Sequence, residues 1–192
     1  IAVIDTVNGL QHLDRYDEAR RQVAVADWLV LTNTDLADGA ALRPRLRALN
    51  PAATVLADSQ AVQVLADMLD SGGRRLRSQC WTADDSASHG SKSQAVTLTW
   101  SEPVSRQPLL ATLRHVVATH GDALLRVSGQ LWFTDESQLY TVQGAGHLLQ
   151  DPEPLAGRPT STERLSRLVI VTDRPLRAVI EAAFSAASGA GR

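Results

Sequence analysis

The segment 27–36 reads Asp-Trp-Leu-Val-Leu-Thr-Asn-Thr-Asp-Leu and decides the fold of the first third of the chain. Its four consecutive apolar residues, 28–31, are typical of a strand buried on both faces of a parallel sheet. Open parallel sheets bind ligands at the carboxyl ends of their strands, and Asp35 falls at that position. Asn33 and Asp35 equally suit a chain reversal and the cap of a following helix. The local sequence leaves both interpretations open.

Strands and helices alternate around this segment. Proline disfavours the α conformation in the residue before it, so Asn50-Pro51 ends one of the helices. The last helix of this part is expected to turn Val62, Leu65 and Leu69 inward. The alternation predicts a parallel sheet with crossover helices over residues 1–71. The expected strands are 1–4 (ending at Asp5), 28–31 and 53–56, and the expected helices are about 14–26, 39–49 and 59–69.

The second half has a different pattern, which begins after a Gly- and Ser-rich stretch, 72–93, that we expect to be a linker. Gly121 is expected to cap the first helix of this half at its C-terminus. Residues 94–188 are predicted to form a small α+β domain, so the predicted fold class is α/β: a partial parallel-sheet domain, then this one. The expected strands are 96–100, 124–133, 139–142, 147–150 and 168–171, and the expected helices are about 105–120 and from Asp173 onward, with Leu176, Ile180 and Phe184 on one face.

Composition excludes several classes of partner. The 192 residues carry 19 basic and 21 acidic side chains, so there is no basic excess that would favour nucleic acid. No apolar run approaches the ~20 residues needed to cross a bilayer, and we expect no membrane partner. The single cysteine, Cys80, excludes an internal disulfide and fits a cytoplasmic location.

Short motifs along the whole chain, taken in order, resemble the CobW-like branch of the P-loop GTPases, a family of metallochaperones. The similarity is to the carboxyl-terminal part of such a protein, comprising the end of a P-loop G domain and a CobW C-terminal domain. The motifs are Ile4-Asp5 at a strand end, Gln22 with Ala26-Asp27, Thr32-Asn33-Thr34-Asp35-Leu36 in the place of the guanine-reading Asn-Lys-x-Asp-Leu, Asn50-Pro51-x-Ala53, Leu125-Arg126-Val127-Ser128-Gly129, Gly144 followed by His147, and Ser166-Arg167-Leu168-Val169.

The resemblance implies a nucleotide-binding role for Thr32, Asn33, Thr34 and Asp35. The chemistry of the last residue supports it, because a carboxylate accepts hydrogen bonds from both N1–H and the exocyclic amine of guanine. Adenine offers no such pair of donors, so Asp35 is expected to select the base. Asn33 replaces the lysine whose aliphatic stem covers the base in the family, and an asparagine side chain does not cover the ring in this way.

Phosphate binding is not expected from this chain alone. It contains no Gly-x-x-x-x-Gly-Lys-Ser/Thr loop, so no catalytic residue is assigned and hydrolysis by the chain alone is not predicted. The sequence opens Ile-Ala-Val-Ile-Asp without methionine, and we expect a fragment of a longer parent protein. That parent is expected to bind GTP or GDP with Mg²⁺, and its upstream half or a second copy of the chain is expected to cover an exposed apolar sheet edge.

No residue is assigned to metal. Cys80, Asp84, Asp85 and His89 have no recognised ligand spacing, and His147 is interpreted as a packed or surface histidine. The resemblance implies that the parent protein transports zinc or cobalt and delivers it to a client metalloprotein. A different class of function stays open: a protein-interaction or regulatory module, independent of nucleotide, on a degenerate G-domain scaffold.

Overall fold

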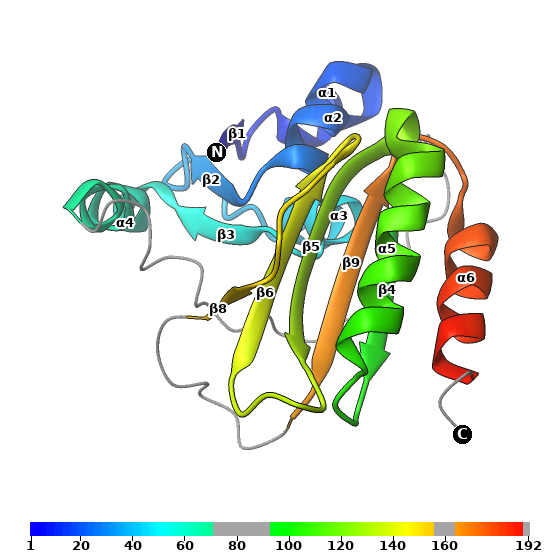
Figure 1. The fold of residues 1–192 in the computed structure, drawn as a ribbon. Coiled ribbons are helices and arrows are strands. Elements are labelled where there is room, and N and C mark those ends of the chain that lie inside the picture. The colour runs from blue at the N-terminus through cyan, green and yellow to red at the C-terminus, as the bar shows by residue number, and fades with distance from the viewer. Residues whose placement is uncertain (71–92, 156–163, 190–192) are drawn as a thin grey trace. The chain divides into compact units, whose positions relative to one another are not determined.

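The computed structural model describes residues 1–70, 93–155 and 164–189, and the chain divides into two units, Ile1–Gly90 and Ser91–Arg192 (Figure 1). The expected linker, 72–93, lies outside the described residues except for Ser93. The observed class is mixed α/β, with a parallel sheet in the first unit and a separate antiparallel sheet in the second, which confirms the predicted fold class.

The first unit is built on a three-stranded parallel sheet in the order β1-β2-β3. The register pairs Asp5 with Thr32 and Leu31 with Ala57, so the three strands end at one edge of the sheet. The strands are β1 (Ala2–Asp5), β2 (Trp28–Thr32) and β3 (Thr54–Ala57), and the helices are α1 (Gly9–Arg15), α2 (Asp17–Val25), α3 (Leu42–Leu49) and α4 (Asp58–Asp70).

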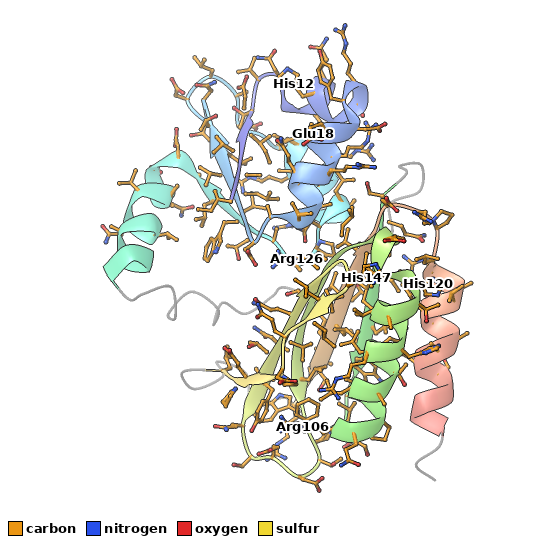
Figure 2. The ribbon with its side chains drawn as sticks, turned by 45° about the horizontal axis from the view of Figure 1, so that its top comes forward. His12, Glu18, Arg106, His120, Arg126 and His147 are labelled. Atoms are coloured by element: carbon orange, nitrogen blue, oxygen red, sulfur yellow. The ribbon has the colours of Figure 1, made fainter. Side chains whose placement is uncertain are left out.

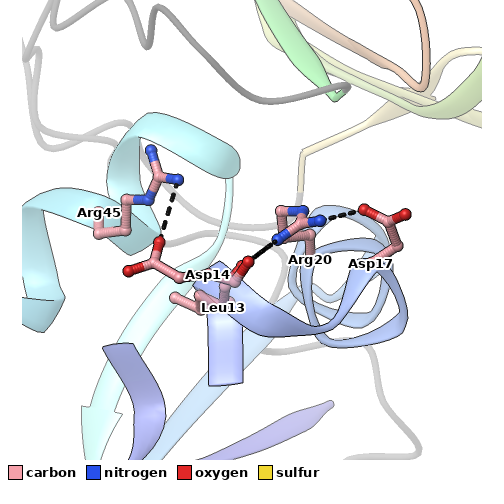
Figure 3. A network of polar contacts seen from close by, with 5 residues as sticks. All are labelled: Leu13, Asp14, Asp17, Arg20 and Arg45. Carbon is pink, nitrogen blue, oxygen red and sulfur yellow. Dashed lines mark hydrogen bonds and ion pairs between the residues drawn. The ribbon is translucent and has the colours of Figure 1, made fainter. Parts of the chain in front are cut away.

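The helix expected at about 14–26 is present as the shorter α2, but α1 was not predicted, and Tyr16 is extended between the two helices. Arg20 contacts both of them (Figure 3). Its guanidinium donates hydrogen bonds to the carbonyl oxygens of Leu13 and Asp14 near the end of α1, and pairs with Asp17 in the first turn of α2. The last carbonyls of a helix have no partner within it, and this arginine supplies one.

Helix α3 begins at Leu42, later than the expected start at Gly39. Gly39 has φ +68°, a left-handed conformation that does not continue into a right-handed helix. Figure 3 also shows Arg45 of α3 reaching Asp14, with 3.7 Å between Nη2 and Oδ1. This ion pair links α3 to the end of α1.

Strand β2 is the centre of the first core. Trp28, Leu29, Val30 and Leu31 are all at most 8% exposed, as expected for a strand covered on both faces. Three leucines of α3 pack into the same cluster, at positions 42, 46 and 49.

Helix α4 is rotated relative to the predicted apolar face. Val62 is 73% exposed, so its expected inward position is wrong. Ala61, at 4% exposed, occupies the inward position instead. The side chains of Leu65 and Leu69 lie outside the described residues.

Apolar side chains are exposed at β1, the strand at one edge of this sheet. Ile1 is 59% and Val3 67% exposed, while Ile4 on the opposite face is buried. An exposed apolar edge was expected here, and what covers it in the parent protein stays a prediction.

The second unit is an antiparallel sheet in the order β4-β9-β5-β6-β7, with β8 paired to β6. Figure 1 shows α5 and α6 side by side along this sheet. Strand β6 extends beyond the expected 139–142, the strand expected at 147–150 is shorter, and β8 was not predicted. The strands are β4 (Gln94–Trp100), β5 (Leu124–Trp132), β6 (Leu139–Ala145), β7 (Leu148–Leu149), β8 (Glu153–Pro154) and β9 (Ser166–Thr172), and the helices are α5 (Arg106–His120), the 3₁₀ helix η2 (Gly121–Ala123) and α6 (Arg177–Gly189).

The apolar face predicted for the last helix is confirmed, and α5 also buries one face. Leu113 of α5 is fully buried, and Ile180 and Phe184 of α6 are at most 3% exposed in the same cluster. Leu176, just before α6, packs against them. No helix in the described residues is long and apolar enough to cross a membrane.

Gly121 is the C-cap residue of α5, as predicted, but it does not adopt the left-handed conformation common for a glycine at a helix end. Its φ of −52° and ψ of −37° are right-handed, and the chain continues directly into η2. Glycine leaves room for His147, because a Cβ at this position would overlap the imidazole and the ring would have to move. The imidazole packs against the backbone at the end of α5.

Candidate functional site

The candidate site lies where β1 and β2 end side by side. Asp5 and Thr32 are register partners at this edge, and the chain after each strand enters a loop. Thr6 joins the two loops, because its N–H donates to the carbonyl oxygen of Thr32 at 3.0 Å. The predicted residues 32–35 are therefore brought beside the end of β1. We call residues 32–36 the β2 turn.

The Asp5 carboxylate accepts hydrogen bonds from N–H groups of three neighbouring residues. The Asn33 side-chain amide donates to Oδ1 at 3.0 Å, the Val7 backbone N–H donates to Oδ1 at 3.0 Å, and the Asn8 amide donates to Oδ2 at 2.6 Å. These bonds, the one from Asn33 first, lower the pKa of Asp5 from 3.8 to about 2. The carboxylate is therefore ionised at any physiological pH.

Asn33 has φ 57°, the left-handed conformation that asparagine adopts more readily than most residues. Its carbonyl oxygen accepts hydrogen bonds from the backbone N–H groups of Leu36, at 3.0 Å, and Ala37, at 3.2 Å. The Thr6 hydroxyl is also within hydrogen-bond distance of that oxygen, at 2.7 Å. Backbone and side chain of Asn33 are both held, so the direction of the turn is fixed.

The other side of the β2 turn is tied to β3 and α4. The Thr34 hydroxyl donates to Oδ1 of Asp58 at 3.1 Å, and the same oxygen accepts the backbone N–H of Ser59 at 2.7 Å. Asp58 opens α4, directly after β3. Each of the two neighbouring strands thus anchors one residue of the turn.

Asp35 directly follows the two anchored residues, Asn33 and Thr34, and its side chain is exposed. No hydrogen bond to its carboxylate is found among the described residues, so both oxygens remain available to a ligand. It does not cap the following helix, because α3 begins at Leu42 and its N-cap is Ala41. Of the interpretations left open by the sequence, chain reversal applies to Asn33 and helix capping applies to neither residue. Ligand binding by Asp35 stays a prediction.

Sequence reasoning did not find the supporting residues. Thr6 and Asp58 form hydrogen bonds to residues of the β2 turn, and Asp5 was noted only as a strand end. Their common signal is position: each follows an expected parallel strand by one or two residues, or ends it. Parallel strands bring such positions to one edge of the sheet. Treating them as a set would have predicted the network.

The second unit holds one polar contact at a histidine. His147 lies 3.0 Å, Nε2 to Oδ1, from Asp122, and Figure 2 shows His147 and His120 near the same end of this unit. The hydrogen bond from His147 and its charge lower the pKa of Asp122. Within the described ranges no three His, Cys, Asp or Glu side chains are grouped as metal ligands. Cys80, Asp84, Asp85 and His89 lie outside those ranges.

Comparison with known proteins defines the class. Residues 93–188 match the family model of the cobalamin synthesis protein CobW C-terminal domain, which covers half of the chain. This chain therefore belongs to the CobW family, the class that the motifs in the β2 turn and the second unit indicated.

The chain is also similar to one particular protein of known class. The chain is 25% identical over 153 residues to the zinc chaperone YjiA of Escherichia coli (strain K12), covering 77% of this chain and 48% of the relative. The chain thus spans about half the length of this relative. Two crystal structures of Zn(II)-bound YjiA GTPase, one of them a triple mutant, share the fold with a TM-score of 0.71 each. They are 23% and 21% identical and match 96% of this chain and 59% of theirs.

Proposed function

We propose that this chain is part of a CobW-like GTP-binding protein that couples GTP binding and hydrolysis to the delivery of a metal ion to a client protein. The observation that carries the proposal is the β2 turn. It presents the exposed Asp35 at the carboxyl edge of a parallel sheet, where such sheets bind ligands, and both neighbouring strands hold it in place.

The residues fit one part of the nucleotide. Asp35 offers two oxygens, which accept no hydrogen bond from the described residues, to the N1–H and amine of guanine, and the preceding Asn33 and Thr34 are anchored to Asp5 and Asp58. The chain has no phosphate loop, and so no loop hydroxyl for Mg²⁺. In this proposal the phosphates and Mg²⁺ are bound by other residues of the parent protein, and this chain selects the base.

The role in metal delivery is inferred from the family. The relative in Escherichia coli is named a zinc chaperone, which supports zinc as the cargo, and cobalt is the second candidate. A client metalloprotein in the cytoplasm is the expected partner, bound through the second unit. The apolar side chains exposed on β1 are proposed to be covered by the remainder of the G domain or by a second copy of the chain.

One observation favours a second function, a protein-interaction module that binds no nucleotide. Asn33 stands where the family motif has lysine, and its amide is used on Asp5. It therefore provides no aliphatic stem for the face of the base. On this account the β2 turn is a scaffold whose Asp35 is simply solvated.

Calorimetry of the parent protein with GDP and with ADP distinguishes the GTP-binding function from the protein-interaction function. GDP is expected to bind more tightly than ADP, and Asp35→Ala should weaken GDP binding by about tenfold or more, because it removes two charge-assisted hydrogen bonds. Asp38→Ala, an exposed carboxylate just after the same turn, should leave affinity unchanged. Equal affinities for GDP and ADP in the wild-type protein would favour the second function.

Coupling to metal needs its own measurement. Zinc affinity of the parent protein is measured by competition with a colorimetric chelator, once with GTP and once with GDP. Coupled sites must show different zinc affinities in the two nucleotide states. The same affinity in both would contradict nucleotide-driven delivery.

A further inference from the structure

We propose that Asp5 is a positioning residue for base selection: it holds Asn33, and through Asn33 it fixes the direction in which the β2 turn presents Asp35. This inference rests on the proposed guanine-binding function. It assigns a specificity role to a residue that touches no base.

The first step is the conformation of Asn33. A left-handed φ of 57° is favoured only in a few residue types, and asparagine is one because its short polar side chain bonds locally. Here the partner of that side chain is Asp5, at 3.0 Å, which lies 28 residues earlier in the chain. The conformation of the turn is thus set by a neighbouring strand.

The second step is the position of Asp35, two residues after Asn33. The backbone N–H groups of Leu36 and Ala37 both bond to the Asn33 carbonyl, at 3.0 and 3.2 Å. Asp35 lies inside this reversal, so a rotation at Asn33 moves its carboxylate. Two hydrogen bonds to one base edge tolerate little displacement, and misplacement lowers selectivity before it abolishes binding.

Asp5 and Asp35 differ in the hydrogen bonds that their carboxylates accept. Asp5 already accepts three hydrogen bonds from protein N–H groups, whereas the described residues give Asp35 none. A carboxylate that already accepts three protein hydrogen bonds is suited to hold its neighbours, and one that accepts none from the described residues is suited to bind a ligand. The low pKa of Asp5 agrees with the first role, because the charge persists throughout the working pH range.

The test is the selectivity ratio, Kd for ADP divided by Kd for GDP, measured by calorimetry on the parent protein. A ratio is used because a partly unfolded sample changes both constants equally. Asp5→Ala should lower the ratio by about tenfold, since it removes a charged acceptor from the Asn33 amide. Asp5→Asn should restore most of it, because the amide oxygen still accepts from Asn33 and Val7. Asp38→Ala is the matched control and should leave the ratio unchanged.

Asn33→Gly provides a second route if Asp5→Ala does not fold. Glycine adopts φ 57° without strain but lacks the amide, so this variant should lower the ratio as Asp5→Ala does. Adding Asp5→Ala to it should change nothing further. A ratio within about twofold of wild type in Asp5→Ala or Asn33→Gly, while Asp35→Ala abolishes selectivity, would overturn the inference and leave the proposed function intact. A wild-type ratio near one would contradict both.

Discussion

At the scale of single residues, the carboxylates of Asp5, at the end of β1, and Asp35, in the β2 turn, have different surroundings. Asp5 is surrounded by donors from its own unit and Asp35 faces solvent, although both follow or end a parallel strand. Sequence position alone predicted ligand binding for the second and no role for the first. The difference arises from long-range contacts between loops, which local patterns do not contain.

The ionisation of Asp5 gives a direct prediction. Its pKa of about 2 lies below the ordinary 3.8, so its hydrogen bonds stabilise the fold fully above pH 3.8. That stability is lost as the pH falls from 3.8 to about 2. Carbon-detected NMR should show the Asp5 carboxyl titrating near pH 2, and Asn33→Ala should raise the midpoint. A midpoint near 3.8 in the wild-type protein would show that the network is absent in solution.

The contact between Gly121 and His147 gives a second prediction. Because a Cβ at position 121 would overlap the imidazole of His147, Gly121→Ala should displace His147 from Asp122. The pKa of Asp122 should then rise toward 3.8, as it should in His147→Ala. Combining the two substitutions should add nothing. An unchanged Asp122 titration in either variant would contradict the contact.

At the scale of elements, the sequence predicted the strands well because β-period and continuous apolar runs are strong signals. It failed where a tertiary contact competes with helical periodicity. Helix α1, whose end is contacted by Arg20 of α2, was not predicted, and Ala61 takes the place expected for Val62. Long-range contacts of this kind are not visible in a window of about a dozen residues.

Helix α2 depends on a residue outside it, and this leads to a third prediction. Asn50 is 1% exposed, and its amide lies 2.8 to 3.0 Å from the carbonyl oxygens of Val23, Ala24 and Ala26. Asn50→Ala leaves these buried acceptors without this donor and should lower the free energy of unfolding by about 1–3 kcal/mol. Urea denaturation measures it. Gln22→Ala, on the exposed face of α2, should stay within about 0.5 kcal/mol of wild type.

Helix α5 carries the core of the second unit, which gives a fourth prediction. Leu113 is fully buried, so Leu113→Ala should lower the free energy of unfolding by about 2–5 kcal/mol. Gln107→Ala, exposed on the same helix, is the control and should change it by no more than about 0.5 kcal/mol. Equal effects of the two substitutions would contradict the assignment of the buried face.

At the scale of the whole molecule, the order of elements and the motifs predicted a parallel-sheet unit followed by an antiparallel one, and both are present. The turn that carries Asp35 was also located from sequence. The network around it was not, since Asp5, Thr6 and Asp58 meet the turn only when three strands align. Family membership suggests the class of function, and the chemistry proposed for the base contact provides a test of nucleotide binding.

The central claim is that Asp35 reads guanine, and exchanging the base tests it most directly. Xanthine has a carbonyl where guanine has its amine, so Asp35→Asn can accept N1–H through its oxygen and donate to that carbonyl through its amide. Calorimetry of the parent protein with GDP and with xanthosine diphosphate should therefore show the preference reversed in Asp35→Asn, by about tenfold or more. An Asp35→Asn protein that still prefers GDP as strongly as the wild type would contradict the account.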